Sequence, residues 1–224
     1  MKREPVPDTA ALDPAAKEAQ FVHRVYAEIA QHFSETRHSG WPFVDGFLQR
    51  QAAGSVGLDI GCGNGKYLGA NRAVHMIGVD YSRELVAICA ERGFDCAVGD
   101  GLRLPVRAGA FDFAICIAVV HHYASEDRRV RALREALRAV RPGGALLVYA
   151  WAQEQQGRRR FDAATQDHLV PWETRAGAVH QRYYHLFRKG ELERLLAQAG
   201  GCRVAESGYE RDNWYVVATK TALP

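Results

Sequence analysis

Residues 59–65 read Asp-Ile-Gly-Cys-Gly-Asn-Gly, and this stretch decides the fold. It follows the strand-like run VGLDI and precedes residues 65–70, which we expect to be helical. Because glycine has no Cβ, alternate glycines let the backbone pass close to a bound ligand. The spacing is G-x-G-x-G, unlike the G-x-G-x-x-G of dinucleotide-binding folds, and Asp59 stands two positions before the first glycine. The stretch therefore predicts a strand, a ligand-binding turn and a helix in succession.

Strand-like runs alternate with helical segments around this turn. The runs are VGLDI, MIGVD, DCAVGD, FDFAICIAVV and GALLVYAW, and the helical segments between them are residues 65–70, 82–92 and 125–140. This alternation predicts a parallel sheet with helices on both faces. A last helix at 189–199 precedes CRVAESGYE and NWYVVATK, which we expect to form a hairpin with an antiparallel strand. The fold class is therefore α/β, doubly wound and Rossmann-like.

Length and patterning indicate a single domain. A chain of 224 residues with 47% hydrophobic content can bury one sizeable core but not two. We expect residues 1–13 to be a mobile tail and residues 14–220 to be the domain, in which Pro14 opens a helix with an apolar stripe over 15–33 and a short helix lies near 43–51. Residues 153–187 read as a long irregular insertion near the active site, and such loops are usually functional in compact domains.

Cysteine usage and hydropathy limit the class of protein. The five cysteines are odd in number and form no C-x-x-C pair, which argues against a disulfide framework and against a cysteine-rich zinc site. We expect no metal in this chain. The most apolar run, residues 111–120, contains Asp112 and is too short to cross a bilayer. We therefore expect a soluble intracellular protein without membrane contact, whose net charge of +3 permits an RNA partner but does not indicate one.

Three acidic residues end successive strands of the expected sheet: Asp59, Asp80 and Asp100. Each could simply cap the helix that follows, which is a common role for Asp at a strand-to-helix turn. Three such acids beside a glycine-rich turn instead favour a ligand site, because an acid at the end of the second strand can accept hydrogen bonds from both hydroxyls of a ribose.

This arrangement resembles the first motifs of the class I methyltransferases that use S-adenosylmethionine. The resemblance implies a seven-stranded, mostly parallel sheet with one antiparallel strand, and carboxylates that receive the ammonium and ribose of the cofactor. It also implies that Asp100 receives the adenine amino group while Tyr81 and Leu102 sandwich the adenine ring. The predicted cofactor site comprises Asp59, Gly61, Gly63, Gly65, Asp80, Tyr81, Asp100, Gly101, Leu102 and Ala118.

Several segments, most of them outside the glycine-rich turn, indicate one particular family of methyltransferases more specifically than the turn does. They are FVHRVY from Phe21, HFSETRH from His32, GNGKYL from Gly63, AVVHH from Ala118, RYYHLFRKGEL from Arg182 and RDNW from Arg211. From about residue 21 to residue 220 the chain resembles the eukaryotic tRNA wobble-uridine carboxymethyl methyltransferases. That resemblance implies methyl transfer to the carboxylate of a 5-carboxymethyl group on the anticodon wobble uridine of tRNA, which yields the methyl ester.

This reaction needs few special groups, because a carboxylate is already ionised at neutral pH and requires no general base. We expect arginine to hold the anion, since its guanidinium grips a carboxylate with two hydrogen bonds and keeps its charge. The family-like segments predict the catalytic residues Arg37, His121, Arg182, Tyr183 and His185. The alternatives are that His121 and His122 are loop histidines satisfied by backbone carbonyls and that Tyr183 and Tyr184 only pack the insertion.

Basic residues of the insertion are candidates for phosphate contact. Arg158, Arg159 and Arg160 form a tight cluster, and Arg188 lies in a family-like segment. The arginine stripe on the helix at 125–140 reads more simply as a solvated face.

The expected edge strand at 95–99 carries Cys96, Ala97 and Val98 without the Lys or Pro that usually protects an edge. The family resemblance implies a small zinc-binding activator subunit that adds a strand there, with the zinc in the partner. We expect the protein in the cytoplasm, with a nuclear pool also compatible with the sequence. Two other functions stay open: a methyltransferase of small molecules such as quinones, and a cofactor-binding scaffold without turnover.

Overall fold

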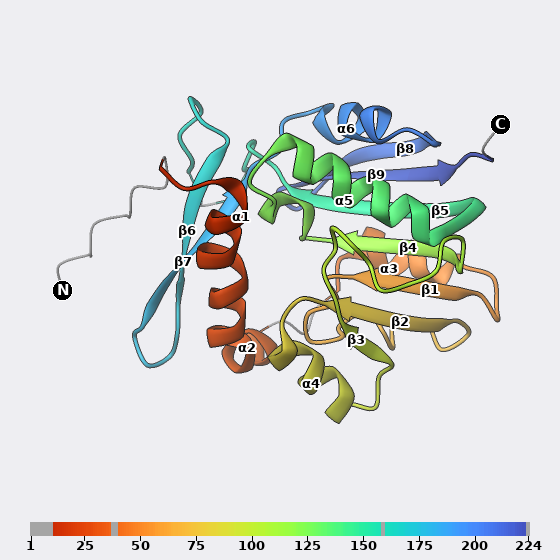
Figure 1. Ribbon diagram of the computed structural model, residues 1–224, viewed down its shortest axis with the longest axis horizontal. Helices are drawn as coiled ribbons and strands as arrows, with labels where there is room; N and C mark the ends of the chain where they lie inside the picture. The colour runs from red at the N-terminus through yellow and green to blue at the C-terminus, as the bar shows by residue number, and fades with distance from the viewer. Residues whose placement is uncertain (1–10, 37–39, 158–159, 223–224) are drawn as a thin grey trace.

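A seven-stranded sheet with the order β3-β2-β1-β4-β5-β9-β8 forms the centre of the molecule (Figure 1). The computed structural model describes residues 11–36, 40–157 and 160–222. The strands of this sheet are β1 (Val56–Ile60), β2 (His75–Asp80), β3 (Cys96–Val98), β4 (Phe111–Ile117), β5 (Val140–Trp151), β8 (Cys202–Glu210) and β9 (Asn213–Lys220). Strands β1 to β5 are parallel, and β9 runs antiparallel to both of its neighbours. The predicted fold class, with one antiparallel strand in a mostly parallel sheet, is confirmed.

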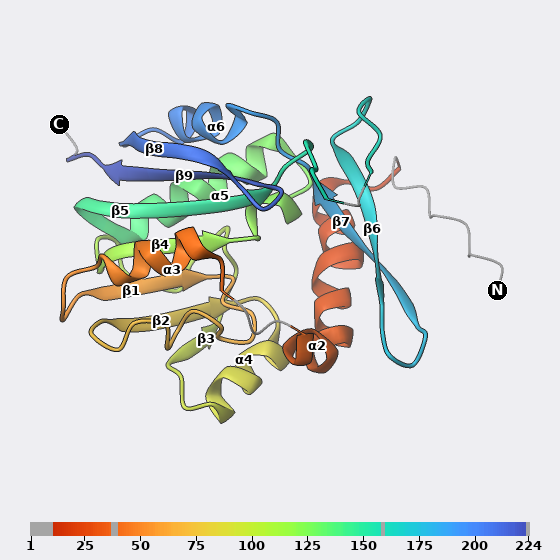
Figure 2. The ribbon, with the colours of Figure 1, turned by 180° about the vertical axis from the view of Figure 1, so that it is seen from behind.

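The later helices cover the two faces of this sheet, and the first two helices stand beside the ends of its strands, as Figures 1 and 2 show from opposite sides. They are α1 (Pro14–Glu18), α2 (Arg24–Thr36), α3 (Pro42–Gln49), α4 (Arg83–Glu91), α5 (Glu126–Ala139) and α6 (Glu191–Ala199), with a π-helical turn η1 (Ala19–His23) and a 3-10 turn η2 (Val120–His122). Leu133 of α5 and Leu195 of α6 belong to the core on one face. Val44 and Leu48 of α3 pack with Phe113 on the other.

The leading helix begins where the sequence predicts. Asp13 caps it by accepting a hydrogen bond from the amide of Ala16 at 2.9 Å, and Pro14 occupies the first turn. Periodicity does not reveal the π-helical turn at Ala19–His23, whose wider ring of hydrogen bonds inserts one extra residue into the helix. That extra residue changes which side chains of the segment face the sheet.

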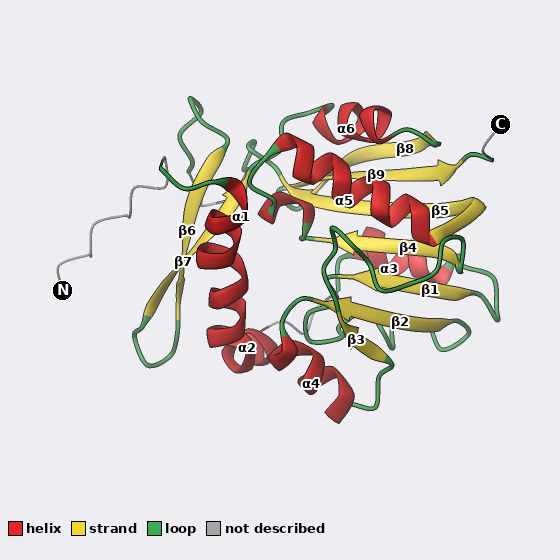
Figure 3. Ribbon diagram, in the orientation of Figure 1, coloured by secondary structure: helices red, strands yellow, loops and turns green. Residues whose placement is uncertain are grey.

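Two predictions about local structure are wrong. Residues 65–70 form a series of turns rather than a helix. The insertion at 153–187 is not irregular throughout, because β6 (Asp167–Glu173) and β7 (Val179–His185) form an antiparallel hairpin that stands beside α2, apart from the main sheet (Figure 3). The hairpin escapes an apolar-run reading because its strands, DHLVPWE and VHQRYYH, contain neither a long apolar run nor a regular alternation of apolar and polar residues.

The parts of the chain that the structure describes include no helix that is long and apolar enough to span a membrane.

Candidate active site

A cavity of about 550 Å³ opens at the carboxyl ends of β1, β2 and β4, where ligands bind in doubly wound sheets. Residues of η1 and α2 close one side of it, and the β6–β7 hairpin contributes Arg182 and Tyr184. This volume lies within the range of ordinary small-molecule sites. The cavity therefore brings the predicted cofactor turn and the predicted substrate residues to one place.

Two glycines shape the floor of the cavity. Gly61 and Gly63 have φ values of +73° and +57°, which side chains rarely adopt. A Cβ on Gly61 would lie 2.2 Å from Cγ2 of Val119. The third glycine of the motif has another role, because Gly65 is not part of the cavity wall and a Cβ there would lie 2.8 Å from Phe94.

Asp59 and Asp80 line the cavity, Asp59 with 2% of its surface exposed and Asp80 partly buried. Burial first, and then the negative charge of Asp80, raise the pKa of Asp59 to about 7. Oδ2 of Asp59 is buried without a hydrogen-bond partner among the described residues. A buried carboxylate oxygen of this kind fits the ammonium group of S-adenosylmethionine, which would supply the missing donor.

Asp80 is held by the glycine turn itself. Its Oδ2 accepts a hydrogen bond from the amide of Gly63 at 2.8 Å, and its Oδ1 accepts one from Ser82 at 2.9 Å. Burial raises its pKa, although these backbone amides act in the opposite direction. The next helix is capped by Ser82, whose hydroxyl accepts from the amide of Leu85, so Asp80 orders the turn and lines the cavity rather than capping that helix.

Asp100 also lines the cavity and accepts a hydrogen bond from the amide of Leu102 at 2.8 Å. The side chain of Leu102 is buried in the core and is not part of the cavity wall, so it does not face Tyr81 across the cavity. Tyr81 instead stacks on His23 of η1, with ring centroids 3.7 Å apart. Gly101 and Ala118 lie in the wall, and Ala118 has a φ of +60°, a strained conformation that occurs mostly at functional sites.

The substrate side of the cavity contains one buried cation. Arg182 is 3% exposed and lies over the rings of Trp172 and Tyr184, at 4.7 Å and 5.1 Å from their centroids. Its Nε has no hydrogen-bond partner among the described residues. Burial acts to lower the pKa of Arg182, but the hydroxyls of Tyr184 and Tyr26 outweigh it and raise the pKa, so the guanidinium is always charged. The site can therefore hold an anion in apolar surroundings.

The two neighbouring histidines have different positions. His121 is fully buried outside the cavity wall, and its Nδ1 accepts a hydrogen bond from the amide of Trp151 at 3.1 Å. His122 lies in the wall, with Nδ1 at 2.8 Å from the carbonyl of Tyr183 and Nε2 at 3.0 Å from the hydroxyl of Tyr26. Since only a protonated Nδ1 can donate to that carbonyl, Nε2 of a neutral His122 accepts from Tyr26. Of the two, only His122 faces the cavity, and the predicted catalytic residue His121 does not.

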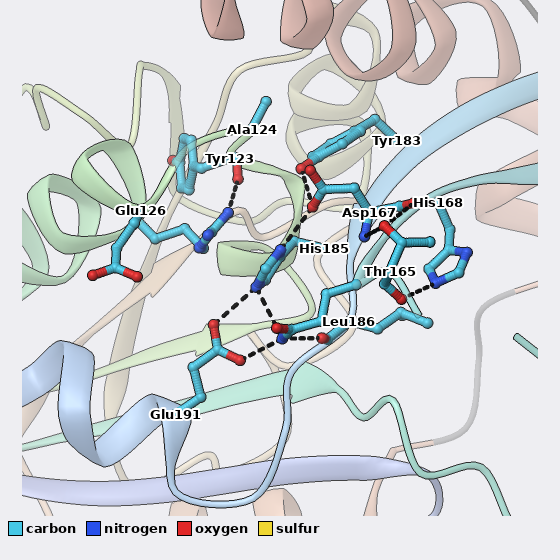
Figure 4. A network of polar contacts seen from close by, with 12 residues as sticks. Tyr123, Ala124, Glu126, Thr165, Asp167, His168, Tyr183, His185, Leu186 and Glu191 are labelled. Atoms are coloured by element: carbon cyan, nitrogen blue, oxygen red, sulfur yellow. Dashed lines mark hydrogen bonds and ion pairs between the residues drawn. The ribbon is translucent and has the colours of Figure 1, made fainter. Parts of the chain in front are cut away.

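Tyr183 and His185 lie on the face of β7 opposite to Arg182, because successive side chains of a strand point to opposite sides. The hydroxyl of Tyr183 donates to Asp167 at 2.8 Å, and His185 lies between Asp167 and Glu191 (Figure 4). Neither side chain is part of the cavity wall. The residue that shares the cavity face with Arg182 is Tyr184, two positions further along the strand.

The structure describes neither the predicted catalytic residue Arg37 nor two of the four predicted RNA-binding arginines. Arg37, Arg158 and Arg159 lie outside the described residues. Arg160 and Arg188 are exposed and bond backbone carbonyls, those of Gly157 and Ala163 respectively. Their role in RNA binding stays a prediction. No group of three or more potential metal ligands is gathered within the described ranges.

Sequence reasoning missed three side chains of the substrate region: Tyr26, His122 and Trp172. Tyr26 reads as one member of a buried helical stripe, and His122 is adjacent to the residue that we selected. If residues 182–185 had been read as a strand, the alternation of side chains along it would have placed Arg182 and Tyr184 on the same face.

Known proteins agree with this fold. A family model described as "Methyltransferase domain" matches residues 58–148. Among solved structures, the CcbJ methyltransferase of Streptomyces caelestis is 14% identical, with a TM-score of 0.68 over 92% of this chain and 98% of that one. A complex of the Haloferax volcanii Trm112 methyltransferase activator with a methyltransferase matches at 15% identity and a TM-score of 0.65, over 90% of this chain and 99% of that one. The fold and the site define a class I S-adenosylmethionine-dependent methyltransferase.

Sequence relatives narrow the class. The tRNA (carboxymethyluridine(34)-5-O)-methyltransferase of Schizosaccharomyces pombe is 45% identical over 91% of this chain and 97% of its own length, and that of Saccharomyces cerevisiae is 38% identical over 92% and 98%. The chain belongs to the tRNA (carboxymethyluridine(34)-5-O)-methyltransferase family. It matches a longer relative from Xenopus tropicalis at 36% identity over 98% of this chain and 44% of that protein.

Proposed function

We propose that this protein transfers the methyl group of S-adenosylmethionine to the carboxylate of 5-carboxymethyluridine at the wobble position of tRNA, which yields the methyl ester. The observation that carries the proposal is the environment of Arg182. Its guanidinium is buried and charged, it lies between aromatic rings, and it faces the same cavity as the cofactor turn. A substrate carboxylate would neutralise this cation and bond its nitrogens.

The chain supplies position and charge rather than a base. The substrate carboxylate is ionised at neutral pH and is itself the nucleophile. S-adenosylmethionine, when bound, supplies a methyl group made electrophilic by the adjacent sulfonium. Arg182 would hold the carboxylate, while the rings of Trp172 and Tyr184 exclude water from it. In-line positioning of two bound reactants contributes up to about 7 to 11 kcal/mol in favourable cases.

The opposite end of the cavity fits the cofactor. Oδ2 of Asp59 would accept from the ammonium group, and the cavity-lining carboxylates of Asp80 and Asp100 would receive the ribose hydroxyls and the adenine amino group. The half-exposed ring of Tyr81 would lie along the adenine. These groups fix one reactant while Arg182 fixes the other.

Methyl transfer tests this proposal directly. The purified protein would be incubated with labelled S-adenosylmethionine and with tRNA that carries 5-carboxymethyluridine at position 34, and the nucleosides would be analysed by mass spectrometry. We expect the methyl ester at position 34, and no product from tRNA that carries unmodified uridine there. Methylation of a quinone-like acceptor without any tRNA product would contradict the proposal.

Two further features belong to the proposal. We infer that Arg158, Arg159, Arg160 and Arg188 contact tRNA phosphates, and that Arg37 binds the substrate carboxylate or the adjoining phosphate. We also infer that a small zinc-binding activator pairs with the edge strand β3. This inference is supported by the 47% exposure of Val98 and by the likeness to a methyltransferase bound to the Trm112 activator. A cytoplasmic location, with a nuclear pool, is consistent with a tRNA substrate.

A further inference from the structure

A charge cluster with a buried centre and one half-exposed carboxylate, Asp167, joins the β6–β7 hairpin to the helical layer on the side away from the cavity. Nδ1 of His185 lies 2.8 Å from Oδ1 of Asp167, and its Nε2 lies 2.8 Å from Oε1 of Glu191. The side chains of His185 and Glu191 are 9% and 10% exposed. Figure 4 shows the imidazole between the two carboxylates, one from β6 and one from the first turn of α6.

The geometry defines the protonation state of His185. A neutral imidazole carries one N–H, so one of its nitrogens would present a lone pair to a carboxylate. Only the imidazolium donates to both carboxylates at once. Burial acts to lower the pKa of His185, but the hydrogen bonds to Asp167 and Glu191 outweigh it and raise the pKa. The pKa values of Asp167 and Glu191 are lowered in turn, since burial is outweighed by their bonds to His185.

Other charged and titratable groups face the cluster from every neighbouring element. Arg129 of α5 is buried, bonds the carbonyl of Tyr123, and acts to lower the pKa of His185. His121 of η2 is buried and neutral, because burial lowers its pKa well below the usual value. Tyr183 shares Oδ1 of Asp167 with His185. The two carboxylates therefore face three cations: His185, Arg129 and Arg194, whose Nη2 lies 4.0 Å from Oε1 of Glu191. Arg194 also pairs with Glu126, so His185 is the cation that lies between Asp167 and Glu191.

The position of the hairpin depends on such contacts. Among the described strands, β6 and β7 form a separate two-stranded sheet. Two residues after β7, Phe187 forms a bridge with Ala152 beside the end of β5, so within the described residues backbone pairing ties the hairpin to the main sheet only at that end. Arg182 is three residues before His185 on β7 and points into the cavity. Any shift of β7 relative to α6 would therefore move the guanidinium of Arg182 relative to the cofactor turn.

We propose that His185, as an imidazolium, is a positioning residue that fastens β7 to α6 and thereby sets the place of Arg182 in the cavity. The proposal rests on the proposed function, because Arg182 is taken there as the group that receives the substrate carboxylate. His185 does not touch the substrate, and it acts through the strand that it shares with Arg182.

The sign of the pH dependence follows from the raised pKa of His185. The fastening is complete below the ordinary histidine pKa and is lost as the pH rises through the higher pKa of the folded protein. The kcat/KM for tRNA should therefore fall on the alkaline side with the midpoint of His185. Glu191→Gln leaves the imidazolium with one carboxylate, so that midpoint should move to lower pH.

The test compares His185→Gln and Glu191→Gln with His168→Gln, a change on the same hairpin outside both the cavity and the cluster. We expect His185→Gln to lower kcat/KM for tRNA by about 10-fold to 100-fold, because small misplacements of a binding group cost that much. Its dissociation constant for S-adenosylmethionine should stay within about twofold of the wild-type value, since the cofactor turn belongs to the main sheet. The alkaline fall of kcat/KM for tRNA should be absent from its pH profile. His168→Gln should behave as the wild type.

Two results would overturn the proposal: a His185→Gln protein with wild-type kcat/KM and alkaline limb, or an imidazole NMR titration that shows neutral His185 at pH 7. The NMR titration of the His185 imidazole, in the wild type and in Glu191→Gln, does not depend on enzymatic activity. It tests the proposal even if the His185→Gln protein does not fold. If the wild type methylates no tRNA, the proposed function fails. The imidazole titration, with hydrogen exchange of β7 at pH 6 and pH 9, still decides whether protonated His185 fastens the strand.

Discussion

The guanidinium of Arg182 lies 4.7 Å from the centroid of the Trp172 ring, across the two strands of the hairpin. Arg182 pairs with Val170 in the register, so Trp172 is its diagonal neighbour, at a distance that long side chains can bridge. The ring covers one side of the cation and leaves its nitrogens to the cavity. This pair therefore fixes where the guanidinium of Arg182 lies in the cavity wall.

Replacement of Arg182 should affect tRNA and spare the cofactor. We expect Arg182→Met to lower kcat/KM for tRNA by about 100-fold or more, because truncation of a buried charge pair costs 2 to 5 kcal/mol. Arg182→Lys should retain part of the activity, since it keeps the charge and loses the two-pronged grip. Steady-state methyl transfer and calorimetric titration of S-adenosylmethionine measure the two effects. Arg203→Lys, an exposed change on β8, is the control. An equal loss of cofactor affinity would show that Arg182 supports the whole site.

Asp59 should make the cofactor-free protein less stable as the pH rises. Its folded pKa of about 7 exceeds the usual value of 3.8, chiefly through burial. The stability that protonation gives is complete below the usual pKa and is lost as the pH rises through the folded value. We therefore expect Asp59→Asn to raise the free energy of unfolding by roughly 2 to 4 kcal/mol at pH 8.5 and by little at pH 4.5. Urea denaturation without cofactor measures this difference.

The same substitution should weaken cofactor binding, because an amide cannot pair with an ammonium group as a carboxylate does. We expect the dissociation constant of S-adenosylmethionine to rise by about 10-fold to 100-fold. Asp127→Asn, on the exposed first turn of α5, controls for the loss of one negative charge. An Asp59→Asn protein that is less stable at every pH would contradict a high pKa for Asp59.

Much of the sheet and of the cofactor end could be predicted from the sequence, because both depend on local rules. A strand buried on both faces needs a continuous apolar run, which VGLDI and FDFAICI show. Since parallel strands end at one edge, Asp59 and Asp80 had to lie close together. The hairpin of β8 and β9 follows from its spacing, and its turn residues Arg211 and Asp212 take positive φ values.

The substrate end was less predictable, because it depends on which way individual side chains point. The resemblance marks Arg182, Tyr183 and His185 together, and only the strand conformation of β7 sends Arg182 to the cavity and the other two away. Likewise, His121 and His122 lie in the same 3-10 turn, and only the side chain of His122 faces the cavity. The hairpin also packs against Phe21 and Val22 of η1, which are distant from it in the sequence.

His122 should contribute a hydrogen bond and no ionisation. Burial lowers its pKa to about 3, so it stays neutral at every pH between 5 and 9. We expect the pH profile of kcat for His122→Gln to have the wild-type shape, because the Gln oxygen can still accept from Tyr26. His122→Ala leaves that hydroxyl without its acceptor and should lower kcat/KM by about 10-fold. An acidic limb near pH 6.5 that disappears in His122→Gln would instead identify His122 as a titrating acid or base.

The free edge of β3 gives a test of the activator. The amide of Gly78 bonds the carbonyl of Asp95, and the amide of Gly99 bonds that of Asp80, so alternate residues of β3 face β2. Cys96 and Val98 therefore direct their backbone groups away from β2, where an added strand would bond them.

Val98→Pro removes one such N–H and should abolish co-purification with a Trm112-type activator. The lone chain should keep its thermal stability to within a few degrees, because proline is tolerated on edge strands. Val98→Ile keeps the N–H and should bind as the wild type. Retention of the activator by Val98→Pro would place the interface on another surface of the sheet, since a strand cannot add to β3 without the hydrogen bond that this amide donates.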